Sequence, residues 1–409
     1  MGSITAPTRN EINFHKVSSA RPDKSFEMAM REDRLTQDDI DLIYEFIAEL
    51  EASQNIGLIR KNKIIYTLVN WRRFICPYRE AKLSDIYKAI SNLKSAKTSR
   101  GRPYKINTVH DYVMFIKRIS LWMIENGYSD LPKEKIQKIK PPRADKTTKR
   151  PDQMLSKEDI ESIIRGCLTS RDRALISVLY ESGCRISELG CLTWGRIRFD
   201  EYGVILTIED TKCSTQRYVR LVMAKPYLSA WRQDYPFEPK GDSLAFITHR
   251  KDPLTYDTTV KIIRRVALRG GVEKHITPHI FRHSRITHLI NEGMNESVIK
   301  LMMWGNINTP MFQTYAHLTG GDIDREVLGS YGIVPKDEKE THALEPLMCP
   351  KCMTINPPKA EFCNHCGVSF TEDAQDTIEE MAKDVNTNPE ILKRMIEEII
   401  EERMKTNAH

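Results

Sequence analysis

Apolar residues recur at helical spacing through most of residues 34–130. The first run, over 35–54, places apolar side chains on one face and charged ones on the other. Its apolar positions include Ile40, Ile43, Phe46 and Ile47. Further helical runs occupy 61–75, 84–95 and 106–127, and strand patterns are absent from this region. We therefore predict an all-helical domain over 34–130, preceded by a flexible polar tail over 1–33.

The pattern changes after a basic segment over residues 131–154. Pro141 and Pro142 forbid a continuous helix there, so we predict an interdomain linker. A capping-box pattern at Ser156 and Asp159 then opens a second domain, predicted over 155–335. This domain has a mainly helical pattern, interrupted by two runs rich in β-branched and aromatic residues. The two runs, at 203–210 and 216–223, flank a polar turn and predict a strand pair.

Cysteines cluster beyond a second linker, predicted over 336–348. Two Cys-x-x-Cys pairs consist of Cys349 and Cys352, then Cys363 and Cys366. Four thiolates at this spacing favour tetrahedral zinc, and so small a segment does not fold without the metal. We predict a zinc ribbon over 349–367 with a structural ion, because four cysteines leave no coordination position for a substrate. An acidic segment with an apolar stripe follows, and it predicts a helical tail over 368–409.

The charge of the chain is unevenly distributed. Residues 336–409 hold 9 Lys/Arg and 16 Asp/Glu, whereas residues 1–335 hold 53 and 40. A basic body favours a polyanionic partner, because neutralising phosphates releases counterions. An ordinary solvated basic surface is the alternative. The basic linker 131–154 has the same two interpretations, a segment that follows a duplex backbone or a solvated hinge.

Length and composition narrow the class of protein further. A chain of 409 residues exceeds what one core usually supports, and 40% hydrophobic with 29% charged residues is typical of a soluble globular protein. No apolar run approaches the roughly 18 residues that a membrane helix needs, and charges occupy the place of a signal peptide's apolar core. We expect a cytoplasmic protein without a membrane partner, and thiols rather than disulfides.

Three stretches of the second domain carry candidate chemistry. GCRISEL contains Arg185 and Glu188, PHIFRH contains His279 and Arg282, and MFQTYAHL contains Tyr315. Two guanidiniums can bind the non-bridging oxygens of one phosphate. A histidine can move protons and a phenol can attack phosphorus. This set breaks and rejoins a phosphodiester without a metal or a nucleotide, so no catalytic cofactor is expected.

The order Arg…Lys…His-x-x-Arg…Tyr resembles the tyrosine recombinase (phage integrase, Xer-type) family over about residues 34–335. ALISVLYESGCRISELGCLTWGRIRF and TPHIFRHSRITHLINEGM are similar to the two arginine boxes of that family along their whole length. The resemblance implies a mainly α fold with a small β-sheet, in which a helical core-binding domain and a catalytic domain close around duplex DNA. The ribbon and the segment after Tyr315 also resemble archaeal integrases of mobile elements.

The resemblance also implies a role for each site residue. Arg185 and Arg282 bind the phosphate, His279 transfers protons, and Tyr315 forms a 3′-phosphotyrosyl link. Lys212, in the polar turn, protonates the departing 5′ oxygen, and a merely solvated lysine is the alternative. Glu188 shares a helical face with Arg185 and is expected to hold its guanidinium.

One further position of the family motif, a His or Trp about nine or ten residues before the tyrosine, is ambiguous in this chain. Asn306 and Trp304 both remain candidates for it. Counting back from Tyr315 and counting forward from Arg282 give registers that differ by one residue.

These observations predict a site-specific DNA recombinase, acting in integration, excision or resolution as a homo-oligomer, a tetramer on paired sites. Two alternatives stay open. One is a topoisomerase-IB-like enzyme that nicks and closes a single duplex with the same chemistry. The other is a catalytically degenerate DNA-binding regulatory protein that lost activity through the change to Asn306.

Overall fold

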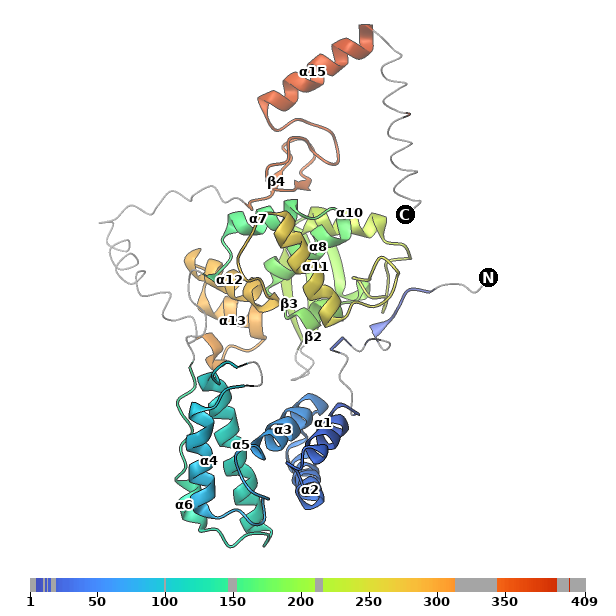
Figure 1. Ribbon diagram of the computed structural model, residues 1–409. Helices are drawn as coiled ribbons and strands as arrows, with labels where there is room; N and C mark the ends of the chain where they lie inside the picture. Colours follow the sequence, from blue (N-terminus) through green and yellow to red (C-terminus); the bar gives the residue numbers. More distant parts are fainter. Residues whose placement is uncertain are drawn as a thin grey trace, which may run out of the picture. The chain divides into compact units, whose positions relative to one another are not determined.

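The computed structural model describes most of the chain, as two compact units (Figure 1). The described residues are 5–9, 12, 14–15, 20–98, 101–145, 153–209, 216–312, 344–387 and 397. The smaller unit is Lys16–Thr148, and the larger unit combines Met1–His15 with Lys149–His409. The chain therefore passes from the larger unit into the smaller one and back again.

Helices build the smaller unit, as predicted. They are α1 (Ala20–Arg31), α2 (Gln37–Gln54), α3 (Leu58–Trp71), α4 (Leu83–Ser95), α5 (Ile106–Glu125) and α6 (Lys133–Gln137). Their apolar faces meet in one core that encloses Ile43, Leu68 and Ile116 completely. Because each helix buries only one stripe, the core depends on their mutual packing rather than on helix propensity.

Two expectations about the flanks of this unit were wrong. The tail predicted as flexible over 1–33 contains α1, and Phe26 and Ala29 of α1 are buried in the core. The linker predicted over 131–154 contributes α6, and its Ile136 and Ile139 are buried in the same core. Both segments have too few apolar residues to form a clear periodic pattern alone. Contact with α3 and with α5, respectively, supplies the surface that they bury against.

A buried ion pair fixes the start of α2. Asp39 is fully buried, and its carboxylate accepts hydrogen bonds from Arg72 Nε at 2.7 Å and from the backbone N–H of Tyr78 at 2.9 Å. Asp39 also belongs to the capping box that Thr36 forms at the N-terminus of α2. One carboxylate thereby joins the first turn of α2 to the segment that follows α3.

Replacing Asp39 with alanine should destabilise the smaller unit by about 3–5 kcal/mol, because the Arg72 guanidinium would remain buried without its counter-charge. Asp38→Ala is the matched control, since Asp38 pairs with Arg79 at an exposed position, where such a pair contributes about 1 kcal/mol or less. Hydrogen exchange of α2 and α3 amides in urea measures both changes. Equal effects of the two substitutions would contradict the assignment.

The larger unit combines a small antiparallel sheet with helices. The strands β1 (Ile197–Asp200), β2 (Gly203–Glu209) and β3 (Gln216–Leu221) pair in the order β1-β2-β3. The helices are α7 (Lys157–Arg165), α8 (Ser170–Ser182), α9 (Ile186–Gly190), α10 (Lys225–Asp234), α11 (Tyr256–Arg269), α12 (Pro278–Asn291) and α13 (Glu296–Trp304), with a 3₁₀ turn at Trp194–Arg196. Helix α8 is buried along nearly its whole length, and it contacts α7, α10, α11, α12 and β3 (Figure 1).

The strand pair and the capping box of the second domain are present where they were predicted. Ser156 and Asp159 cap α7 reciprocally. Strand β3 alternates between exposed and buried positions, and Val219 pairs with Leu206 of β2 on the buried side. The short strand β1 was not predicted, because a run of only four residues carries little periodic signal.

An N-terminal segment, the strap, lies on the larger unit; its described residues are 5–9, 12, 14 and 15. The Pro7 carbonyl accepts a hydrogen bond from the N–H of Leu244 at 2.9 Å, and the Phe14 carbonyl accepts one from the N–H of Tyr256 at 2.8 Å. The Phe14 side chain is buried in the core of this unit. The expectation of a flexible tail was therefore also wrong here, since backbone contacts distant in sequence hold the strap.

The C-terminal part of the larger unit contains β4 (Leu347–Met348) paired antiparallel with β5 (Ile355–Asn356), followed by α15 (Glu372–Thr387). The apolar stripe predicted near the end of the chain lies outside the described residues. Among the described helices, none combines the length and the apolar character of a membrane span. The cytoplasmic location stays a prediction.

Candidate active site and metal centre

A buried carboxylate, Glu188, joins two arginines from different elements. Arg185, the N-cap residue of α9, donates to Glu188 from Nη1 at 2.8 Å and from its backbone N–H at 2.6 Å. Arg217 of β3 donates to the same carboxylate from Nη2 at 2.7 Å and from Nη1 at 3.2 Å. Arg217 also donates from Nε to the Met302 carbonyl at 2.9 Å. The contact expected between Glu188 and Arg185 is present, and it is part of a larger network.

Electrostatics keep Glu188 ionised. Burial opposes ionisation, but the hydrogen bonds and charge of Arg217, followed by those of Arg185, outweigh it and lower the pKa of the carboxyl. Side-chain exposure is 2% for Glu188 and 3% for Arg217, whereas Arg185 keeps 32%. The buried pair therefore serves as a fixed support, and Arg185 is the member of the network that reaches the surface.

The second predicted arginine, Arg282, is anchored to the same region. It lies on α12, is 7% exposed, and donates from Nη1 to the Gly183 carbonyl at 2.7 Å. Its Nη2 donates to the Met303 carbonyl at 2.7 Å. Because Gly183 is only two residues before Arg185, this hydrogen bond brings the second arginine box to the first.

Gly183 makes this arrangement possible. It ends α8 in the left-handed conformation with φ 56°, and a Cβ at this position would lie 2.7 Å from Met303 Sδ. A side chain would therefore be strained in the backbone and would also collide with α13. The glycine lets the chain turn from α8 into α9, so that Arg185 and the carbonyl bound by Arg282 occur in one short turn.

The remaining predicted residues differ in their surroundings. Trp304 ends α13, and its ring lies 5.2 Å from the Arg282 guanidinium carbon. Asn306 is exposed, and its side-chain oxygen accepts a hydrogen bond from the N–H of Asn308 at 2.8 Å. His279 is exposed on the first turn of α12, one helical turn before Arg282. Of the two candidates for the ambiguous position, Trp304 contacts an arginine of the site.

Lys212 and Tyr315 lie outside the described residues.

Sequence reasoning did not identify the structural role of Arg217. Its neighbours in β3 contain a usable signal, since Arg217, Val219 and Leu221 alternate with exposed residues and share the buried face. An arginine on the buried face of an alternating strand requires a carboxylate or several carbonyls nearby. The partner of Arg217 is Glu188, 29 residues earlier in the chain, and only the three-dimensional structure identifies it.

His288 has a structural environment. Its Nδ1 lies 2.8 Å from the Tyr180 hydroxyl, and the two rings meet edge to face. Burial, assisted by the charges of Lys157 and Arg285, lowers the pKa of His288 from 6.5 to about 4. The neutral imidazole is therefore the form that the folded unit accommodates.

This shift predicts an acid-sensitive contribution to stability. The contribution is complete above pH 6.5 and is lost as the pH falls from 6.5 to about 4, because the unfolded chain binds the proton more tightly. Between pH 7 and pH 4.5 the wild type should lose about 2–3 kcal/mol more unfolding free energy than His288→Gln does. Urea unfolding at both pH values measures the difference, with the exposed His275→Gln as control. Parallel pH profiles for wild type and His288→Gln would exclude this contribution.

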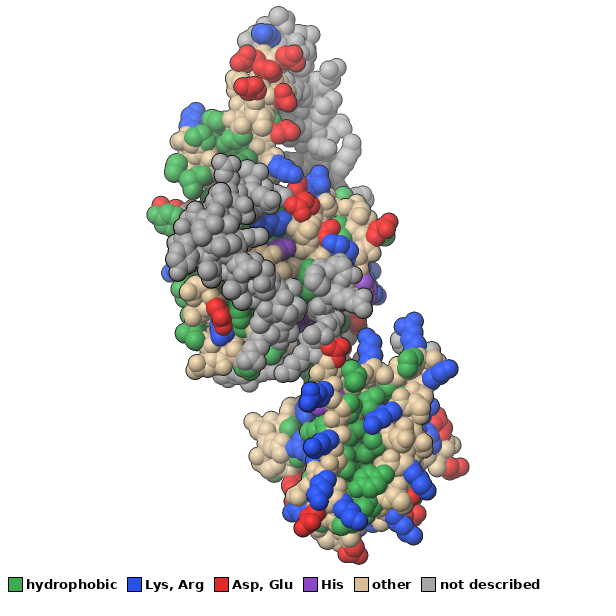
Figure 2. Space-filling view, turned by 90° about the vertical axis from the view of Figure 1, so that its left-hand side faces the viewer, with side chains coloured by type: hydrophobic (Ala, Val, Ile, Leu, Met, Phe, Trp, Pro, Cys, Tyr) green, Lys and Arg blue, Asp and Glu red, His purple; other side chains and the backbone are tan. Residues whose placement is uncertain are grey.

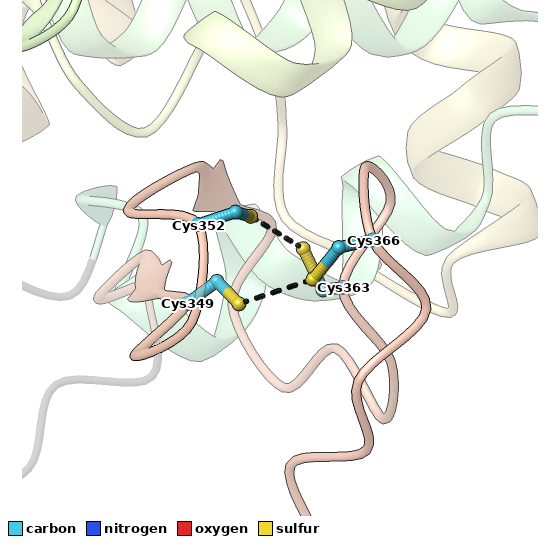
Figure 3. A group of neighbouring side chains, drawn as sticks. All are labelled: Cys349, Cys352, Cys363 and Cys366. Carbon is cyan, nitrogen blue, oxygen red and sulfur yellow. Dashed lines mark hydrogen bonds between the residues drawn. The ribbon is translucent and has the colours of Figure 1, made fainter.

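The four predicted ligand cysteines meet at a second centre. The sulfur atoms of Cys349, Cys352, Cys363 and Cys366 all lie within 4.8 Å of one another, and Figure 3 shows them converging on one point. Tetrahedral zinc with Zn–S bonds of about 2.3 Å separates its sulfurs by about 3.8 Å, which this cluster accommodates. In each Cys-x-x-Cys pair, a backbone N–H four residues after the first cysteine donates a hydrogen bond to the carbonyl of that cysteine at 2.9 Å. The donor is Met353 for Cys349 and Gly367 for Cys363. The donor set and its geometry therefore fit zinc.

Part of the chain matches a known protein family. Residues 153–320, which include both arginine boxes, Lys212 and Tyr315, match the phage integrase family. Tyrosine recombinase XerD of Listeria innocua is 31% identical over 177 residues, which cover 41% of this chain and 58% of that protein. The chain thus spans little more than half the length of this relative.

Two solved structures share the fold. A Tn1549 transposon integrase in complex with a circular intermediate DNA is 20% identical, with a TM-score of 0.51, and covers 70% of this chain and 98% of its own. A lambda integrase tetramer bound to a Holliday junction is 14% identical, with a TM-score of 0.52, and covers 66% and 76%. At these identities the likeness establishes the fold, and it confirms the mainly α class with a small sheet.

Proposed function

We propose that the protein is a site-specific DNA recombinase of the tyrosine (phage integrase) type, which cleaves and rejoins duplex DNA. The observation that carries this proposal is the hydrogen bond from Arg282 to the Gly183 carbonyl, two residues before Arg185. Two arginines that meet at one turn of the chain are suited to the non-bridging oxygens of a single phosphate. The family match over residues 153–320 supports the same reaction.

The proposed reaction is a transesterification. The Tyr315 oxygen attacks the scissile phosphorus, a 3′-phosphotyrosyl bond forms, and the bond to the 5′ oxygen breaks. Lys212 supplies the proton that the departing 5′ oxygen takes, and His279 accepts the proton that the Tyr315 hydroxyl loses. Arg185 and Arg282 neutralise the charge that develops on the phosphate, for which one preorganised donor contributes about 10²–10³ in rate. Because a phosphoester bond is retained throughout, a 5′-hydroxyl from another strand can reverse the step.

For the ambiguous position we propose Trp304 rather than Asn306. The Trp304 ring covers the Arg282 guanidinium, and its indole N–H is a donor suited to a phosphate oxygen. The Asn306 side chain instead caps its own turn. With a tryptophan in place, the asparagine gives no reason to infer lost catalysis, which argues against the degenerate regulatory protein.

The proposed partner is duplex DNA, bound with the help of the smaller unit. Figure 2 shows lysines and arginines spread over one face of this unit. The exposed lysines of α4, of α6 and of the residue after α6 include Lys88, Lys94, Lys133, Lys135 and Lys138. Such charges bind phosphates and release counterions without reading a sequence.

We further propose a homo-oligomer on paired sites, by analogy with the lambda integrase tetramer. An enzyme acting on one duplex, as a topoisomerase does, would not retain a second DNA site in its complex. The archaeal character of the chain stays a prediction from the ribbon and the segment after Tyr315.

Covalent trapping tests the reaction directly. On nicked suicide duplexes taken from the flanks of its own gene, the wild type should form a protein–DNA adduct on denaturing gels without added metal or ATP. Tyr315→Phe should form none, yet bind the duplex within about twofold of wild type, because only one hydroxyl is lost. Adducts that persist in Tyr315→Phe would disprove the nucleophile, and none from wild type on a bound target site would disprove the reaction.

We propose that Cys349, Cys352, Cys363 and Cys366 hold a structural zinc ion. The ion would cross-link the two Cys-x-x-Cys pairs and supply the folding energy that so short a segment lacks. Each cysteine would bind as a thiolate, and a closed four-sulfur shell leaves the metal no part in cleavage.

Metal analysis tests the ribbon. The purified wild type should contain about one zinc ion per chain, and the double variant Cys349→Ser, Cys352→Ser should contain almost none, because two remaining thiolates bind the ion weakly. Cys76→Ser, in the smaller unit, is the control and should keep its zinc. Adduct formation by the double variant should continue, since the cleavage chemistry uses no metal. Wild type lacking zinc after purification without chelators would disprove the assignment.

A further inference from the structure

The strap contacts the short helix that carries Glu188. The Phe14 ring is 5% exposed and is part of the core of the larger unit. A Cβ built on Gly190, the last residue of α9, would lie only 2.2 Å from a carbon of this ring. The ring therefore lies directly against α9, and the glycine provides the space for it.

The strap also contacts the strand pair that contains Arg217. Arg9 Nη1 donates to the carboxylate of Glu209, the last residue of β2, at 2.6 Å. Arg196 binds the second oxygen of that carboxylate at 2.5 Å, and Gln216 donates to the same oxygen at 3.2 Å. The hydrogen bonds of Arg196, followed by those of Arg9, lower the pKa of Glu209 to about 2. Arg9 is thus one of two arginines on an ionised carboxylate at the end of the strand pair where the chain leaves β2 and later enters β3.

Backbone contacts fix both ends of the strap. Near its start, Thr8 pairs with Ser243 in an antiparallel bridge, next to the hydrogen bond between Pro7 and Leu244. Near its end, the Phe14 carbonyl is bound by the N–H of Tyr256. Arg9 and Phe14 are therefore presented from two anchored backbone positions.

Neither strap contact is made to Glu188 itself, but both are made to residues beside it. Arg9, Glu188 and Glu209 line one recess of the larger unit. Glu209 pairs in register with Gln216, and the next residue, Arg217, holds the Glu188 carboxylate from β3. Phe14 supports α9, and Arg9 supports the end of β2. The strap thus touches α9, which carries Glu188, and β2, the strand that pairs with β3 and its Arg217.

We propose that the strap positions Arg185 for catalysis by holding α9 against the β2–β3 pair, with Phe14 and Arg9 as the positioning residues. The inference rests on the proposed function, in which Arg185 binds the scissile phosphate. Neither strap residue touches DNA in this account. They act through Glu188, which also holds Arg185 and whose contact with Arg217 depends on the spacing between α9 and β3.

The test compares cleavage of a normal phosphodiester with cleavage of a methylphosphonate at the scissile position, under single-turnover conditions with saturating protein. The methylphosphonate replaces a charged non-bridging oxygen with a neutral methyl group, so it has less need of a well-placed guanidinium. Arg9→Ala and Phe14→Ala should each cleave the phosphodiester about tenfold more slowly than wild type. On the methylphosphonate, the rate deficit of Arg9→Ala and Phe14→Ala relative to wild type should shrink to about twofold. The deficit of Arg185→Ala, which removes the guanidinium itself and serves as the benchmark, should shrink in the same way.

Control variants distinguish the positioning of Arg185 from a general effect on the stability of the larger unit. Thr5→Ala changes an exposed strap residue and should cleave both substrates like wild type. Gly190→Ala should slow the full-length protein, because the added methyl collides with Phe14. In a chain lacking residues 1–15, Gly190→Ala should cause no further loss, since the ring is gone.

The outcomes are distinct. A deficit of equal size on both substrates, no deficit in Arg9→Ala and Phe14→Ala, or a full additional loss from Gly190→Ala in the shortened chain would each overturn the inference. An unaltered protein that forms no adduct with either substrate would instead remove the proposed function, and the inference with it.

Discussion

The Glu188 carboxylate is the interaction on which the candidate site depends. It is held between Arg217 from the sheet and Arg185 from the start of α9, and only Arg185 is substantially exposed. Without this carboxylate, Arg217 would be a buried guanidinium lacking its counter-charge, which in proteins costs about 3–5 kcal/mol. The charge that stabilises the sheet against α9 is therefore also the charge that orients Arg185.

Arg282 is held by backbone carbonyls rather than by a carboxylate, and it is anchored to the same region of the structure. Two backbone carbonyls, of Gly183 and Met303, receive separate nitrogens of its guanidinium. A lysine ammonium is a point charge and cannot reproduce this fork. The arrangement ties α12 to the turn before α9 and to the end of α13, so helices far apart in sequence share one arginine. Trp304 belongs to this group through its contact with the Arg282 guanidinium.

Local patterns predicted much of this structure. The helices α2, α3, α4 and α5, the strands β2 and β3, the Ser156 cap and the cysteine cluster all follow from short-range spacing, which contiguous residues encode. Helix α1, the strap and the partner of Arg217 did not follow, because each depends on a surface contributed by distant residues. Counting residues left Trp304 and Asn306 equivalent, whereas their three-dimensional contacts distinguish them.

The most direct test of the account is a crystal structure of Tyr315→Phe bound to an uncleaved duplex that contains its target site. The account predicts that the guanidiniums of Arg185 and Arg282 both lie within about 3 Å of non-bridging oxygens of one phosphate, the one that would be cleaved. Guanidiniums on two different phosphates, or an Arg282 that contacts only the Gly183 and Met303 carbonyls, would contradict it.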